Sequence, residues 1–489
     1  MELNWLDRTL DWISPSLGLR RVKARKQAEI ALAYDAVRSD RRKGGWNPNS
    51  TSGDYEIGVS LVKMRDQARA LYRDNPFARR ISREFSKRAV GYGLTPQCDT
   101  GNPALNATVD GYWLEFVRNC SSDQRTNFYA EQKRIALAAF VSGECLIRMW
   151  NRRPEDGLAV PFQIQVIESD LLDHGKTETL KDGWITQGVE FDLLGHIRGY
   201  WLFGQHPGGI VQMPNRTMTS KFVSAEYVLY HGELERPGDA RAVTRLSAVM
   251  NTLRDLEEYM DANLFKKKIE ACFAVNVETA EGPDGAPMGQ RMTDANGRTV
   301  EKVEPGMVTY TGPGQKVSTM APSVNGDFPS DVKTYGKAIS SGSGVPYVTA
   351  FDDLEAVNYS SYRGGAISFR EDVEEYRYNW LIPQVLDPIW QRFIDTLILK
   401  GAIPQKAYPV KWNPPPFDLL DRRAEAEADE IELRIGKTSF PELCGKQGVD
   451  PEKRMKEIEQ WKPRLDKAGV TFNPKGAVNG DSQNPPPVS

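Results

Sequence analysis

Apolar residues recur at two different spacings along the chain, and the spacing separates helical from extended regions. Between 75 and 91 they repeat at every fourth position, which predicts one buried helix face: Phe77, Ile81, Phe85 and Ala89. Asn75 followed by Pro76 is a typical helix start, and Gly91 is a typical stop. The other side of this helix carries five cations and is either a solvated face or a surface for DNA or a partner: Arg79, Arg80, Arg83, Lys87 and Arg88.

The spacing changes to two between 160 and 231. In 161–166 the apolar residues alternate with glutamines, as a half-buried strand requires. Residues 188–203 predict two strands joined by a turn at 192–195, and 223–231 predicts one more strand. Together these strands form a small β-rich subdomain.

Helical spacing returns at 243–270, where one apolar stripe predicts a helix of about 28 residues, roughly 42 Å long. Residues 271–327 alternate short strand-like runs with turns rich in glycine, proline, asparagine and aspartate. A shorter helix is predicted at 328–343, and the polar stretch 344–358 predicts a loop.

A second long helix is predicted from residue 359. Its apolar residues form a 3-4-3-4 seam: Ala366, Phe369, Val373, Tyr376 and Trp380. Three arginines recur every seven residues beside the seam: Arg363, Arg370 and Arg377. Such a seam serves either packing within the chain or a repeated helix–helix interface. Pro383 and Pro388 should kink or interrupt this helix.

Both ends of the chain are polar. The first 45 residues are basic and predict either a solvated arm with a helix or two, or a contact to nucleic acid or an acidic partner. Near the other end, an acidic helical segment closes at Gly436, Ser439 and Glu442 form a capping box, and a last helix stops at Gly469. Residues 470–489 are too polar and proline-rich to bury a core, so we expect disorder there.

The overall charge is nearly balanced, with 63 lysines and arginines against 66 acids and a net charge of −3. This balance argues against tight binding of nucleic acid, which depends on cations that neutralise phosphates. The five cysteines form no CxxC pair, so we expect reduced thiols in an intracellular protein. No signal peptide or membrane-spanning apolar run is evident, and we expect a soluble protein with no membrane partner.

No pattern in the sequence indicates catalysis, a cofactor or a metal. The four histidines lack metal-ligand spacing, and His231, after an apolar strand, is expected to be structural. Gly436-Lys437-Thr438 resembles the end of a phosphate-binding loop, but Ile431 occupies the required earlier glycine position and a helix precedes it. We therefore expect no enzyme activity.

Six blocks of the sequence resemble the portal proteins of tailed bacteriophages, lambda-type family, in that family's order: 74–96, 141–148, 166–172, 230–264, 344–365 and 418–459. The most specific is 344–365, in which an aspartate precedes Asn-Tyr-Ser-Ser and a basic residue. The resemblance covers roughly 60–469.

The resemblance implies an α+β portal fold, mainly helical, with a small β-rich wing and a β-containing clip, assembled as a ring. It implies these parts: an arm (1–59), the wing (60–242), a stem helix (243–270), the clip (271–327), a second stem helix (328–343), a tunnel loop (344–358), a long helix and wing return (359–417), a helical crown (418–469) and a disordered tail (470–489).

By the same resemblance, twelve copies would form a channel at one capsid vertex for packaging and ejection of double-stranded DNA. The implied partners are the terminase large subunit, the major capsid or scaffolding protein and a head–tail adaptor, in the virion and, during assembly, in the host cytoplasm. The alternatives are another head–tail connector ring component, which is usually much shorter, or a packaging-motor subunit, which would need a phosphate-binding loop.

The resemblance also assigns candidate residues. The tunnel loop would present these to the channel: Asp352, Asp353, Glu355, Asn358 and Tyr359. Independently of the resemblance, their seven-residue spacing beside the seam makes Arg363, Arg370 and Arg377 candidates for inter-subunit contacts. The alternative for the three acids is that they cap the helix near Ser360 or pair with Arg363, away from the channel.

Overall fold

The computed structural model describes residues 50–210, 218–272, 275–278, 290–293, 299–302, 308–311, 327–355, 359–417, 422–447, 449 and 451–468. The chain divides into two units, Met1–Ser52 and Gly53–Ser489, and the fold below is that of the second. The expected arm therefore lies outside the described residues up to 49, and so does the expected tail. Asn358 and most of the expected clip also lie outside them.

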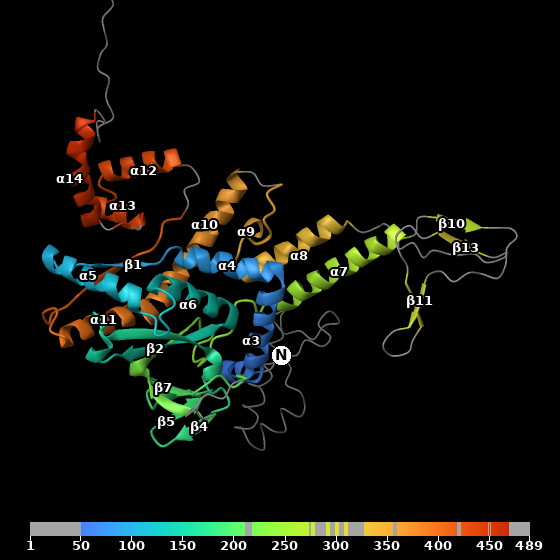
Figure 1. Cartoon of the computed structure of the whole chain (residues 1–489), viewed down its shortest axis with the longest axis horizontal. Helices are drawn as coiled ribbons and strands as arrows, with labels where there is room; N and C mark the ends of the chain where they lie inside the picture. The colour runs from blue at the N-terminus through green and yellow to red at the C-terminus, as the bar shows by residue number, and fades with distance from the viewer. Residues whose placement is uncertain are drawn as a thin grey trace, which may run out of the picture. The chain divides into compact units, whose positions relative to one another are not determined.

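Helices make up most of the described chain (Figure 1). Their bounds are α3 Gly53–Asp74, α4 Pro76–Val90, α5 Pro103–Asn119, α6 Phe128–Ser142, α7 Met250–Cys272, α8 Phe328–Ser343, α9 Tyr347–Phe351, α10 Tyr359–Glu375, α11 Asp387–Leu399, α12 Arg422–Arg434, α13 Phe440–Lys446 and α14 Pro451–Lys467. Within these residues, no helix has both the length and the apolar character needed to cross a membrane.

Among the described residues, the strands form five small sheets. Their bounds are β1 Thr95–Cys98, β2 Glu144–Asn151, β3 Phe162–Glu168, β4 Glu178–Leu180, β5 Gly183–Thr186, β6 Val189–Asp192, β7 Ile197–Leu202, β8 Lys221–Ser224, β9 Val228–Gly232, β10 Val275–Glu278, β11 Gln290–Thr293, β12 Thr299–Lys302, β13 Val308–Thr311 and β14 Val410–Asn413. The mixture of helices with mainly antiparallel sheets agrees with the expected α+β class.

Side-chain caps begin the helices α4, α5 and α6. The Asn75 side chain accepts hydrogen bonds from the backbone N–H groups of Phe77 and Ala78, and Pro76 follows it. At the start of α5 the Asn102 side chain accepts from Ala104 and Leu105, and at the start of α6 the Asn127 side chain accepts from Ala130 alone. The helix predicted at 75–91 is confirmed. α3 begins at Gly53, within the residues predicted as the arm.

Two sheets share the β-rich region. β2 lies between β3 and β9, and the strands β4 to β8 form an antiparallel meander. The predicted turn at 192–195 joins β6 to β7, where the Asp192 carboxylate accepts from the N–H groups of Leu194 and His196. The single strand predicted at 223–231 is wrong. A 3-10 turn at Ala225–Tyr227 divides it into β8 and β9, which belong to different sheets.

α7 and α8 run beside each other (Figure 1). The Tyr259 ring lies 5.5 Å from that of Phe328, and its hydroxyl donates to Asp331 at 2.8 Å. The prediction of 328–343 as a helix is confirmed. α7 begins seven residues later than the predicted start at 243, and turns occupy 245–249 just before it. Between them, β10 pairs with β13 and β11 with β12.

The predicted long helix continues past both prolines. From Tyr376 to Leu386 the chain forms a π-helical segment, η5, and α11 follows without a break. The Asp387 N–H donates to the Ile382 carbonyl five residues earlier, a wider turn than the α-helix. A proline lacks the N–H group and crowds the carbonyl four residues back, so a wider turn accommodates Pro383. Of the two predicted outcomes, a kink or an interruption, the interruption does not occur.

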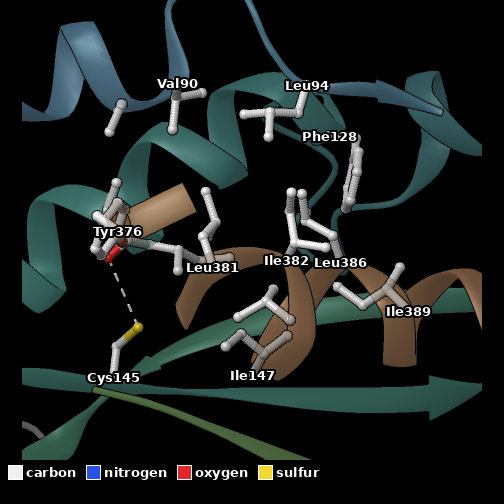
Figure 2. Close-up of a cluster of buried hydrophobic side chains, with 14 of the residues drawn as sticks. Val90, Leu94, Phe128, Cys145, Ile147, Tyr376, Leu381, Ile382, Leu386 and Ile389 are labelled. Atoms are coloured by element: carbon white, nitrogen blue, oxygen red, sulfur yellow. Dashed lines mark hydrogen bonds between the residues drawn. The ribbon is translucent and has the colours of Figure 1, made fainter. Parts of the chain in front are cut away.

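One large core fills the space between α4, α6, β2 and η5. Figure 2 shows Leu381, Ile382 and Leu386 of η5 facing Ile147 of β2, with Val90 of α4 on the other side. Alternation along β2 buries both of its faces, because Ile147 joins this core and Leu146 joins a smaller one beneath the five-stranded sheet.

Candidate functional site

The segment after α8 was predicted as a loop, and the structure gives it a short helix. α8 ends at Gly344, whose φ of 71° favours glycine, and α9 forms a single turn from Tyr347 to Phe351. Asp352 then adopts a left-handed conformation with φ 59° and ends α9. The acids of the candidate tunnel loop therefore lie directly behind a helical turn.

α4 holds this turn in place. The Arg80 guanidinium donates to the Thr349 carbonyl at 2.7 Å and to the Asp352 carboxylate at 2.8 Å. Beside it, the rings of Phe77 and Phe351 lie 4.6 Å apart. Part of the basic side of α4 thus binds the candidate loop of the same chain.

Asp353 has a different set of partners. Its carboxylate accepts from the Glu355 N–H at 3.2 Å and the Tyr347 hydroxyl at 3.1 Å, and Lys333 lies 3.7 Å away. The backbone hydrogen bond, more than the Tyr347 hydroxyl and Lys333, lowers the pKa of Asp353. Burial, aided by the same carboxylate, raises the pKa of Tyr347 to about 12. Both groups therefore keep one charge state near neutral pH.

Asp352 and Asp353 do not pair with Arg363, which was one alternative for these acids. Asp352 pairs with Arg80, and Asp353 lies beside Lys333. Glu355 is exposed at the end of the described loop. Tyr359 is the first residue of α10. No sequence pattern indicated Lys333 as a partner, whereas Arg80 belonged to the basic stripe of α4.

The three seven-spaced arginines of the long helix have different environments. Arg363 is exposed, and Arg370 is half exposed and pairs with Glu374 at 3.2 Å. Arg377 is only 1% exposed, and its guanidinium donates to the carbonyls of Ala89 at 2.7 Å and Arg88 at 2.6 Å. Burial lowers the pKa of Arg377 to about 10. These contacts lie within the chain, and the buried Arg377 side chain leaves little surface for the expected inter-subunit contact.

Arg370 and Arg377 also border a cavity of about 530 Å³, which the segment Pro414–Phe417 and residues of α12 and α13 line as well. Both guanidinium carbons lie 4.8 Å from the centre of the Phe417 ring. The cavity contains acids as well as cations, among them Glu374, Glu432 and Glu442, so it does not select one sign of charge.

A buried ion pair, which the sequence did not reveal, joins several parts of the predicted wing. The Arg241 and Glu144 side chains are fully buried and bonded to each other, and the Tyr230 hydroxyl donates to Glu144 at 2.6 Å. Arg241 also donates to the Gln187 carbonyl at 2.8 Å. Loss of either charge would leave the other buried and unpaired, which typically costs about 3–5 kcal/mol.

One cluster of metal-binding residue types lies nearby. Glu168, Asp170 and His206 place ligand atoms within 4.8 Å of one another. However, Arg65 and Arg69 already contact the Asp170 carboxylate at 3.0 and 2.6 Å. Burial opposes the charged carboxylate, but these guanidinium groups outweigh it and lower the pKa of Asp170. Two cations already neutralise Asp170, so the cluster offers no argument for a metal ion.

The comparison that decides the family is a match over residues 39–377 to the model described as "Phage portal protein, lambda family". The chain belongs to this family. A relative named "Probable portal protein", from Halomonas phage phiHAP-1, is 25% identical over 485 residues, covering 93% of this chain and 90% of the relative. This portal protein is therefore a structural component of a phage-like particle.

Two solved structures are also similar. A chain in the neck of a native gene transfer agent (GTA) particle, computed with C12 symmetry, is 15% identical with a TM-score of 0.40, covering 81% of this chain and 94% of that one. A chain in the virion of a native GTA particle is 16% identical with a TM-score of 0.38, covering 83% and 95%. The portal assignment rests on the sequence matches.

The match to the portal family ends within η5, so α11 and the helices of the predicted crown, α12 to α14, lie beyond it. It includes the ion pair of Arg241 with Glu144, the loop contacts of Arg80 and both helices of the predicted stem. The parts of the portal protein that carry the candidate channel residues are thus inside the matched range.

Proposed function

We propose that this portal protein forms a closed ring of twelve copies at one capsid vertex and that double-stranded DNA passes through its centre during packaging and ejection. The observation that carries the proposal is the match to the lambda portal family over residues 39–377. A structural role in a ring is also consistent with a largely helical chain whose sequence has no recognisable catalytic motif.

The parts of the chain receive roles on the same basis. α7 and α8, joined by the contacts of Tyr259 with Phe328 and Asp331, would be the stem. The residues between them would be the clip, which docks the terminase large subunit and a head–tail adaptor. The wing (60–242) would face the major capsid or scaffolding protein.

Residues 344–358 would be the tunnel loop. The attachment of α9 to α4 through Arg80 and Phe77 supports this role, because a loop that lines a channel must be held at a fixed radius. Asp352 and Asp353 sit beside cations of their own chain, so the loop presents a mixed rather than a strongly basic surface. Such a surface would let DNA slide without binding.

The test is the mass of the purified protein without nucleotide. Twelve copies of the 54.9 kDa chain give about 0.66 MDa by light scattering. Negative-stain images should show closed rings with a central hole. A stable monomer or dimer at micromolar concentration would contradict the proposal, and nucleotide hydrolysis by the pure protein would favour a packaging-motor subunit instead.

A further inference from the structure

The helices α12 and α14 bury very little within one copy of the chain. Among their residues whose burial the structure describes, Pro451 alone is buried. Large apolar side chains are exposed on both, including Ile431 at 47%, Ile435 at 65% and Trp461 at 54%. A single copy of the chain therefore exposes one apolar surface on α12 and another on α14.

Helices of this length need a partner for their apolar face. α12 has 13 residues and α14 has 17, close to the length of about 12–15 residues below which isolated helices are marginal in water. Most helix stability in proteins comes from packing of an amphipathic face. These two faces should therefore be covered in the assembled protein.

The two surfaces have the same geometry. The α12 stripe consists of Ala428, Ile431 and Ile435, and the α14 stripe consists of Ile458, Trp461 and Leu465. Both follow the spacing i, i+3, i+7, which is one face of a helix. The Ile435 N–H donates to the Ile431 carbonyl at 3.0 Å, so the helical turn extends to the end of the α12 stripe. The α14 stripe borders a shallow groove of about 190 Å³.

Their charges are opposite. α12 carries five acids and three cations, a net charge of −2, and α14 carries six cations and four acids, a net charge of +2. Two cations, Arg454 and Lys462, and one acid, Glu457, border the groove on α14 beside the apolar residues, and Arg454 lies 3.8 Å from Glu457. Opposite charge around matched apolar stripes favours contact between the two surfaces.

We propose that the α12 stripe of one copy packs against the α14 stripe of the next copy. This inference rests on the ring of the proposed function, in which each copy has one neighbour on either side. A contact between two different surfaces is heterologous, and heterologous contacts are those that generate closed rings. The crown would then add a circle of helix pairs to the ring.

Cysteine cross-linking tests the pairing. In the double variant Ile431→Cys/Trp461→Cys, a short bismaleimide should link neighbouring copies into a ladder that extends to the full ring on a denaturing gel. Each single variant should show no more cross-linking than the wild type, whose described cysteines, Cys98, Cys120, Cys145 and Cys444, are buried. The matched control is Leu433→Cys/Trp461→Cys, because Leu433 is 42% exposed but lies on the opposite side of α12.

A second pair of variants tests the charge. Lys462→Glu places an acid beside the α14 stripe and should reduce the cross-linked fraction roughly two- to fivefold for each ion pair lost. Lys456→Glu makes the same change on the opposite side of α14 and should leave that fraction unchanged.

Three results would overturn the inference. Cross-linking of the single variants would indicate contact between identical surfaces, and a link confined to one copy would place both stripes in the same subunit. Rings of normal size without a ladder would mean that neighbouring copies do not cover the stripes and that another protein, such as a scaffolding protein, does. The proposed function would still stand. If the wild type forms no ring by light scattering, the proposed function fails, and this inference fails with it.

Discussion

At the scale of single residues, His231 shows how a buried polar group can be fully satisfied. The Gln384 side chain accepts from the Gly232 N–H and donates to the Gly232 carbonyl, which fixes which end of the amide is oxygen. That oxygen lies 2.8 Å from His231 Nδ1, so Nδ1 carries the proton and Nε2 accepts from the Tyr376 hydroxyl at 2.8 Å. The neutral imidazole thus joins β9 to η5, and the expected structural role of His231 agrees with these contacts.

This arrangement predicts a loss of stability in acid. Burial lowers the pKa of His231 to about 4, below its ordinary value of 6.5, so the folded protein binds fewer protons than the unfolded chain between these values. The contribution is present above pH 6.5 and declines as the pH falls toward 4, by roughly 3 kcal/mol in all. His231→Gln should unfold at a lower temperature at pH 7.5 but lose less between pH 6.5 and 4.5 than the wild type. Equal losses in both proteins would contradict this.

At the scale of elements, Arg377 joins the side of η5 to the C-terminal end of α4. Its guanidinium binds two of the last carbonyls of α4, which the helix itself leaves unpaired, and Gly91 ends the helix at the same point. A planar guanidinium can reach both carbonyls at once, and a cation at a helix C-terminus is also favoured by the helix dipole.

Arg377→Lys should therefore destabilise the chain while leaving ring size unchanged. The ammonium group can replace one of the two hydrogen bonds but not both, and a buried unsatisfied acceptor costs about 1–3 kcal/mol. The matched control is Arg370→Lys, at a half-exposed site, which should change stability by less than about 0.5 kcal/mol. Thermal unfolding and light scattering on the same samples separate the effects. Loss of rings at an unchanged unfolding temperature would instead support an inter-subunit contact.

The elements that the sequence predicted well are those whose ends are marked locally. The caps at Asn75 and Ser439 were evident because the capping side chain and the groups it binds lie within three residues of each other. The continuation of the long helix past Pro383 was not, because local rules favour a break and only the packing of Leu381, Ile382 and Leu386 on β2 holds the wider turn.

The candidate site was predictable only in outline. The family resemblance located the loop and its acids, but the cations that neutralise them come from positions 80 and 333, and no spacing rule connects these to 352 and 353. The same holds for Glu144 and Arg241, which are almost 100 residues apart in the sequence. Contacts between distant segments depend on the fold, and a periodic pattern carries no information about them.

At the scale of the whole molecule, the charges are arranged as a conduit would need. The chain is close to neutral, and in the candidate tunnel loop Asp352 and Asp353 are paired with Arg80 and Lys333. Each cation that meets a DNA phosphate adds affinity that would have to be broken at every step of translocation. A loop whose charges are already paired avoids this while keeping its shape.

Glu355 offers the sharpest test of that view, because it is exposed and its replacement leaves the ion pairs of Asp352 and Asp353 intact. Glu355→Lys adds one cation per copy, and the rings should retain DNA at low salt and release it as salt rises, with a slope of about −0.9 in log affinity per phosphate contacted. Packaging should slow for the same reason. The control Glu355→Gln removes the charge without adding a cation and should retain no more DNA than the wild type. If Glu355→Lys rings assemble normally and hold no more DNA at low salt than the Glu355→Gln rings, residue 355 does not face the DNA, and the placement of the loop at the channel would have to be abandoned.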